Sequence, residues 1–149
     1  MRKKLVALLL IAAPVFVACR ASGPVPGAQG GGASTPRAAV EQFLAAARAQ
    51  DIRATSLIWG SREGPATVTI DRDKIERQVV TMHCFLRHDR YAIIDETPVL
   101  EGQRRFTVDL TAGSLTRRTN IVAVPANAGG WYVVSTDLEP LRDICANRQ

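Results

Sequence analysis

Residues 104–124 read RRFTVDLTAGSLTRRTNIVAV, and this stretch decides the fold. Apolar and polar side chains alternate along its first half, which is typical of a β-strand with one buried and one solvated face. Gly113 and Ser114 suit a tight two-residue turn with glycine first, so the second half is expected to return as an antiparallel strand. Such a turn places Asp109 opposite Arg118. The stretch therefore predicts a β-hairpin.

Further extended segments flank this hairpin on both sides. Residues 91–100 are rich in β-forming side chains, and residues 131–136 form another short apolar run after a glycine-containing turn. Residues 137–147 are too short for a long helix, but they have apolar residues at helical spacing. We expect a run of antiparallel strands followed by one or two helical turns.

Three stretches before the strands have apolar residues at the spacing of an amphipathic helix. Thr35 can cap the first of them, and Pro36 fits the first helical position. Asp51 and Asp71 are expected to cap the second and third. Residues 66–70 alternate and predict a short strand or an extended loop.

Helices followed by antiparallel strands predict an α+β domain over residues 35–149, with the N-terminal helices packed on one face of a curved antiparallel sheet. A chain of 149 residues fits one such domain. Aromatic residues make up only 5%, too few for a surface that stacks on single-stranded nucleic acid. A protein that crosses a membrane several times is excluded, because the one long apolar run lies at the N-terminus.

The opening helix of this domain carries a family resemblance. Residues 35–51, TPRAAVEQFLAAARAQD, resemble the first helix of nuclear-transport-factor-two-like domains, the cone-shaped folds shared with ketosteroid isomerase and polyketide cyclases. In that family an aspartate starts a second helix and an aromatic residue often follows, the places that Asp51 and Trp59 fill here. The resemblance implies a cone-like fold. It does not fix a function, because the fold hosts enzymes, binding modules and assembly domains.

The first residues have the anatomy of a secretory leader. The cations Arg2, Lys3 and Lys4 precede the apolar run 5–17, which is too short to span a bilayer. The run ends at Cys19 after a small residue, which resembles a bacterial lipobox, although Phe16 stands where leucine is usual. The resemblance implies a signal peptide at 1–18 and diacylation of Cys19. The alternative is an ordinary cleaved leader with a cysteine nearby.

A lipid on Cys19 would make the membrane the first partner of this protein. Residues 19–34 are dominated by Gly, Ala, Pro and Ser and predict a flexible tether of roughly 20 Å. Arg20 stands where aspartate would signal inner-membrane retention, so the resemblance favours the outer membrane in a double-membraned host. Losing the three leader cations lowers the formal charge from +5 to +2, which leaves no electrostatic argument for a nucleic-acid partner.

Two of the three cysteines remain once Cys19 is assigned to lipid. In an oxidising compartment Cys84 and Cys145 are expected to form a disulfide. The alternatives are two free buried thiols or a nucleophilic cysteine beside His83. A metal site of His83, Cys84 and His88 is not expected, because adjacent side chains on a helix do not point to a common centre. The histidines are expected to be partly exposed at the end of the helix.

Five residues are candidates for a pocket: Trp59, Tyr91, Asp95, Asp109 and Arg118. An aspartate beside an arginine could position a water molecule or polarise a carbonyl group. The alternative, which we favour, is a cross-strand ion pair on the solvated face. The aromatic residues could equally be ordinary core residues.

The expected function is binding. We expect a membrane-tethered envelope protein whose domain binds a small molecule or an envelope protein, without catalysis and without a cofactor, since no phosphate-binding loop or metalloprotease motif is present. One alternative is an isomerase-like or cyclase-like enzyme with Asp95 or Asp109 as base. Another is an assembly domain that forms a homodimer through the open face of its sheet.

Overall fold

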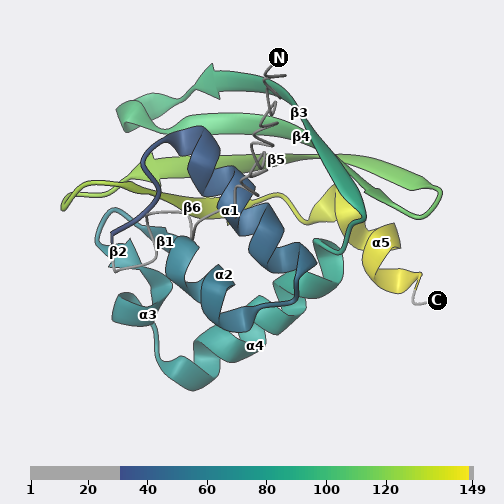
Figure 1. Cartoon of the computed structure of the whole chain (residues 1–149), viewed down its shortest axis with the longest axis horizontal. Helices are drawn as coiled ribbons and strands as arrows, with labels where there is room; N and C mark the ends of the chain where they lie inside the picture. Colours follow the sequence, from purple (N-terminus) through teal and green to yellow (C-terminus); the bar gives the residue numbers. More distant parts are fainter. Residues whose placement is uncertain (1–30, 148–149) are drawn as a thin grey trace, which may run out of the picture.

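The computed structural model describes residues 31–147 and confirms an α+β architecture (Figure 1). Its main sheet is antiparallel with the strand order β3-β4-β5-β6. Helices cover one face of this sheet, and the strands follow one another as a simple meander. The strands are β3 (Arg90–Pro98), β4 (Arg104–Ala112), β5 (Leu115–Pro125) and β6 (Trp131–Thr136).

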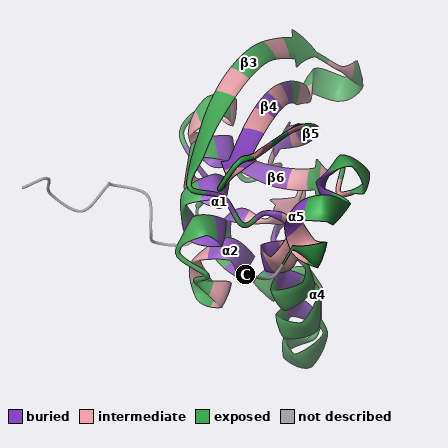
Figure 2. Cartoon of the chain, turned by 90° about the vertical axis from the view of Figure 1, so that its right-hand side faces the viewer, coloured by how far each residue is buried: buried purple, intermediate pink, exposed green. Residues whose placement is uncertain are grey.

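Helix α1 (Pro36–Arg48) lies against the sheet and begins as its sequence predicts. The Thr35 side chain accepts a hydrogen bond from the backbone N–H of Ala38 at 3.0 Å, and Pro36 occupies the first turn. The buried side of α1 packs against β4, β5 and β6 and contributes to the main core (Figure 2). The largest side chains on that side are Val40, Phe43 and Leu44.

The β4–β5 hairpin has the predicted register. Asp109 is paired with Arg118 and Thr107 with Asn120. Gly113 adopts φ +58 in the turn, a left-handed conformation that glycine adopts without steric cost. The sequence therefore determined which side chains of this hairpin face the core.

The segment 66–70 is not extended, contrary to the prediction. A small hairpin of β1 (Gly60–Ser61) and β2 (Gly64–Pro65) leads into the short helix α3 (Ala66–Thr69). The apolar residue that suggested alternation, Val68, points to solvent and is 73% exposed. Ala66 is buried and Ile70 is partly buried, so the three alternating apolar residues do not share one buried face, as they would in a half-buried strand.

Two further helices complete the layer. Helix α2 (Ile52–Ile58) is capped as predicted, with Asp51 accepting a hydrogen bond from Ala54 N–H at 2.9 Å. Helix α4 (Arg72–Phe85) starts after Asp71, but the Asp71 side chain makes no capping hydrogen bond, which corrects the predicted cap. Only its backbone carbonyl accepts bonds from the first turn.

Ordered contacts begin before Thr35. Ala33 is buried and forms an antiparallel bridge with Trp131, and Gly32 N–H donates to the Tyr132 hydroxyl at 2.8 Å. The folded part thus includes residues that the sequence suggested were tether. The leader, Cys19 and residues 20–30 lie outside the described residues.

The C-terminal segment packs against the main hydrophobic core. It forms a 3-10 turn η2 (Glu139–Leu141) and the short helix α5 (Arg142–Ala146), as its length predicted. Leu141 and Ile144 are buried within the main cluster. A second 3-10 turn, η1 (Leu100–Gly102), connects β3 to β4.

Candidate functional site

The space between α1 and the sheet is filled by side chains. Residues from α1, from strands β4, β5 and β6, from the end of α4 and from the C-terminal segment form one cluster with almost no exposed surface. A cone-like domain would have its ligand pocket in this space, so the side chains packed there matter for ligand binding and for catalysis. The largest of these side chains are Phe43, Leu44, Leu86, Phe106, Leu110, Ile121, Leu141 and Ile144.

The two aromatic candidates lie apart. Trp59 ends α2, is half-buried and packs against both hydrophobic clusters of the domain. Tyr91 begins β3 and meets the ring of His88 edge-on, with the ring centroids 5.8 Å apart. Burial is the main reason that the pKa of Tyr91 is raised, and Glu41 adds to the shift. Neither aromatic ring forms a wall shared with the other candidates.

The two aspartates and Arg118 lie on the outer face of the sheet. Tyr91 is paired with Leu110, whereas Asp109 is paired with Ala92, so alternation places Tyr91 and Asp109 on opposite faces. Asp95 follows the irregularity in β3, is exposed, and is paired with Thr107. The five candidate residues therefore do not form one pocket.

Asp109 and Arg118 form a bidentate ion pair, as the favoured alternative predicted. Arg118 donates from Nε to Oδ1 at 2.7 Å and from Nη2 to Oδ2 at 2.8 Å. These hydrogen bonds hold the pKa of Asp109 below its usual range. A general base at neutral pH needs a raised pKa, so this environment favours a structural ion pair.

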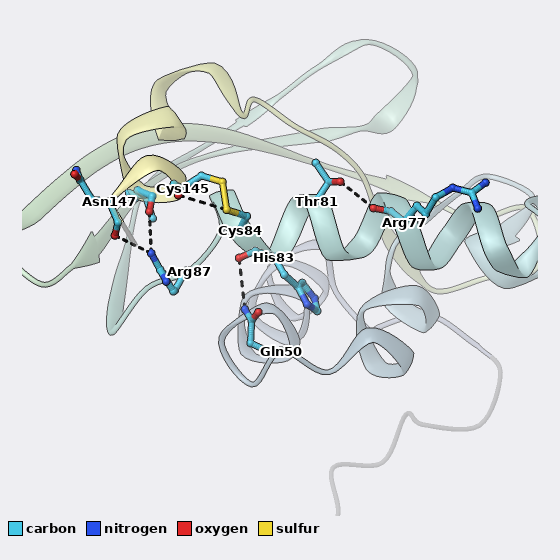
Figure 3. Close-up of a disulfide and its surroundings, with 9 residues drawn as sticks. Gln50, Arg77, Thr81, His83, Cys84, Arg87, Cys145 and Asn147 are labelled. Carbon is cyan, nitrogen blue, oxygen red and sulfur yellow. Dashed lines mark hydrogen bonds between the residues drawn. A yellow bond between two sulfur atoms is a disulfide. The ribbon is translucent and has the colours of Figure 1, made fainter. Parts of the chain in front are cut away.

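The predicted disulfide is present and joins the end of α4 to α5 (Figure 3). Arg87 lies beside it and donates from Nη2 to the backbone carbonyls of Ile144 at 3.1 Å and Asn147 at 3.0 Å. These bonds satisfy carbonyl groups at the end of a helix that is too short to be stable alone. The bridge and Arg87 together fix the C-terminal segment on the fold.

Both histidines are buried, which corrects the prediction of partly exposed side chains. His83 is 3% exposed and its Nε2 is hydrogen-bonded to Thr55 Oγ1 at 2.8 Å. His88 is 4% exposed and donates from Nδ1 to the carbonyl of Leu86 at 2.7 Å. Desolvation lowers the pKa of each imidazole. The signal that sequence reasoning missed is that His83 follows Val79 by four residues on the buried side of α4.

His83, Cys84 and His88 are not arranged as metal ligands. The sulfur of Cys84 is in the disulfide, and each histidine has its own hydrogen-bond partner in the protein. Within residues 31–147, no group of three or more His, Cys, Asp and Glu side chains is placed to hold a metal ion.

An open groove of about 490 Å³ lies between α2, α3 and α4, away from the sheet. Sequence reasoning did not find it, because its three walls come from separate helices and α3 was expected to be extended. Four apolar side chains line it: Ile52, Leu57, Ile70 and Ile75. Its volume falls in the range of about 300–1,000 Å³ that is usual for small-molecule sites.

The floor of this groove is the smaller of two hydrophobic clusters. Only Ala66, Ile75 and Val79 are fully buried in it, and Ile52 and Ile70 pack against them while remaining partly exposed. A core of this size leaves apolar surface in contact with water. The groove therefore offers a ligand pre-formed apolar surface that the domain itself does not bury.

Comparison with protein-family models, curated proteins and solved structures finds no match for this chain. Among the helices of residues 31–147, none is both long and apolar enough to span a membrane.

Proposed function

We propose that this chain is an exported protein, anchored in the cell envelope by lipid on Cys19, whose folded domain binds a ligand or a partner and is not a catalyst. Arg20, which stands where aspartate would signal inner-membrane retention, favours the outer membrane in a double-membraned host. The order of helices and meandering strands agrees with the resemblance to nuclear-transport-factor-two-like domains, which we retain as part of the proposal.

The disulfide between Cys84 and Cys145 is the observation that carries this proposal. Structural disulfides form and persist in oxidising compartments outside the cytosol. Export requires a leader, and the sequence before Cys19 has the charge, the short apolar run and the small residue that a lipoprotein leader needs. Thus two independent features of the chain favour the same location.

The chemistry of the carboxylates favours binding over catalysis. Asp109 is held ionised by Arg118, and Asp95 lies exposed at the edge of the sheet. The interior, where an isomerase-like or cyclase-like enzyme would hold its substrate, is filled by residues such as Phe43 and Phe106. We therefore prefer the binding function to the enzymatic alternative.

Metabolic labelling with an alkyne analogue of palmitate tests the anchor. The parent chain and the control Ser22→Ala, expressed in a bacterium, are expected to incorporate the label and to sediment with membranes. Cys19→Ser should incorporate none. An unlabelled parent chain, or a Cys19→Ser chain labelled as strongly as the parent, would refute the proposed anchor.

A further inference from the structure

The groove between α2, α3 and α4 combines an apolar floor with a charged rim. On α2, Arg53 and Leu57 stand four residues apart and line the groove on the same side of the helix. On α4, Arg72 lines it beside Ile75. Apolar and cationic side chains thus meet in one cavity. The three helices that line it, α2, α3 and α4, lie in the lower part of Figure 1.

No ion pair among the described residues neutralises the two arginines that line the groove. Arg53 and Arg72 are exposed, and neither takes part in any ion pair that the described residues form. Glu76 is the acidic residue of the lining, and it too lacks such a pair. The rim therefore has an excess of positive charge. Unpaired guanidinium groups are suited to bidentate recognition of a carboxylate or phosphate.

Three of the four apolar side chains that line the groove are incompletely buried, so a ligand that covers them would gain binding free energy. Leu57 is 37% exposed, and Ile52 and Ile70 are only partly covered by the small cluster beneath them. A ligand chain lying over these side chains would gain about 0.8 kcal/mol for each methylene group removed from water. The walls are short, since α3 covers only Ala66–Thr69, which suits a single narrow chain rather than a long peptide helix.

From these features we propose that the groove binds a single-chain anionic amphiphile, with its alkyl chain on Leu57 and Ile70 and its head group between Arg53 and Arg72. This inference rests on the proposed function, because it names the ligand of a domain that acts by binding. Carboxylate and phosphate head groups share the relevant chemistry. The site is separate from the core between α1 and the sheet.

Calorimetric titration tests this inference on the full chain carrying Cys19→Ser, which removes the site of the proposed lipid. The probes are dodecanoate, dodecyl phosphate and dodecanol, with the two anions below their critical micelle concentrations and dodecanol below its solubility limit. We expect both anions to bind and dodecanol to bind more weakly. The anion that binds with the higher affinity identifies the head group that the site prefers.

Matched variants locate the binding. Leu57→Asp should weaken dodecanoate binding by about tenfold or more, since it removes apolar contact and adds a like charge. Val80→Asp, at an exposed apolar position of α4 outside the lining, should leave binding unchanged. The double variant Arg53→Gln with Arg72→Gln should lose the preference for anions, whereas Arg77→Gln should retain it.

Four results would overturn the inference. The first is that the parent chain binds neither anion, and the second is that it binds dodecanol as tightly as dodecanoate. The third is that Leu57→Asp and Val80→Asp weaken dodecanoate binding equally. The fourth is that the parent chain self-associates and that Leu57→Asp abolishes this association. The last would assign the groove to a second copy of this chain. None of them depends on palmitate labelling of Cys19, so failure of this inference is distinguishable from failure of the proposed anchor.

Discussion

The Cα atoms of Cys84 and Cys145 lie 4.9 Å apart although the two residues are separated by 61 positions in the sequence. The bridge joins the end of α4 to the C-terminal helix, which contributes Ile144 to the main core. A short helix at the end of a chain gains little from its own backbone hydrogen bonds. Its place on the fold depends on this bridge and on buried apolar contacts.

Removing the bridge should therefore destabilise the whole domain. The double variant Cys84→Ser with Cys145→Ser is expected to lose roughly 4 kcal/mol of unfolding free energy, because the reduced unfolded chain has more conformational freedom. Urea unfolding of the parent and the variant measures the difference. Cys19→Ser serves as the control and should unfold like the parent. An unchanged urea midpoint in the double variant would contradict a structural role for the bridge.

The N-cap residues of α1, α2 and α4 are expected to differ in the stability that is lost when each is replaced by alanine. Thr35→Ala and Asp51→Ala each remove a side-chain cap and should cost about 1 kcal/mol of stability. Asp71→Ala should cost clearly less, because its side chain makes no capping bond. Thermal or urea unfolding of the three variants gives the comparison. Equal losses at all three positions would show that the cap assignments are wrong.

The two faces of β4 should differ in their sensitivity to substitution. Asp109→Asn breaks an exposed ion pair and should change stability little, since solvent and salt screen such pairs. Phe106→Ala empties a fully buried position and should cost about 3–5 kcal/mol. Denaturant unfolding at equal ionic strength measures both. A loss in Asp109→Asn comparable to that in Phe106→Ala would show that the outer face has a role beyond solvation.

The buried histidines predict a pH dependence of stability. Desolvation lowers the pKa of both His83 and His88 in the folded state, so the unfolded chain binds protons more readily. Stability should be full above the ordinary histidine pKa of about 6.5 and should fall as the pH drops below it. Unfolding free energies measured from pH 7.5 to pH 5 test this expectation.

The variant His83→Gln retains a polar side chain opposite Thr55 but cannot be protonated in this range. Its stability should depend less steeply on pH than that of the parent. Asp51 acts in the opposite direction, since its charge raises the pKa of His83 and reduces the effect. A parent chain whose stability is flat across this range, or a variant with the same slope, would contradict the assignment.

The main sheet was predictable because its determinants are local. A two-residue turn at Gly113 fixes the pairing of Asp109 with Arg118, and alternation then fixes which side chains are buried. The same reasoning failed for residues 66–70, where Ala66 and Ile70, four residues apart, face the smaller hydrophobic cluster and Val68 between them faces solvent. Burial of that segment depends on β1, β2 and α4 packing around it, which no local pattern records.

The candidate site was less predictable than the fold. The groove joins α2, α3 and α4, and its charged and apolar residues become neighbours only after these helices pack. Trp59, Tyr91 and Asp109 looked promising individually, but strand alternation and helix packing separate them. The disulfide could be predicted from the number of cysteines and the expected export, because neither argument requires knowledge of the fold.

The central claim is that the mature protein begins with a lipid-modified Cys19. Mass spectrometry of the N-terminal peptide, released from protein that has been extracted from membranes, tests it most directly. The account predicts a peptide that starts at Cys19 and carries at least two acyl chains on a glyceryl thioether. A mature peptide that starts elsewhere, or an unmodified Cys19 thiol, would contradict it.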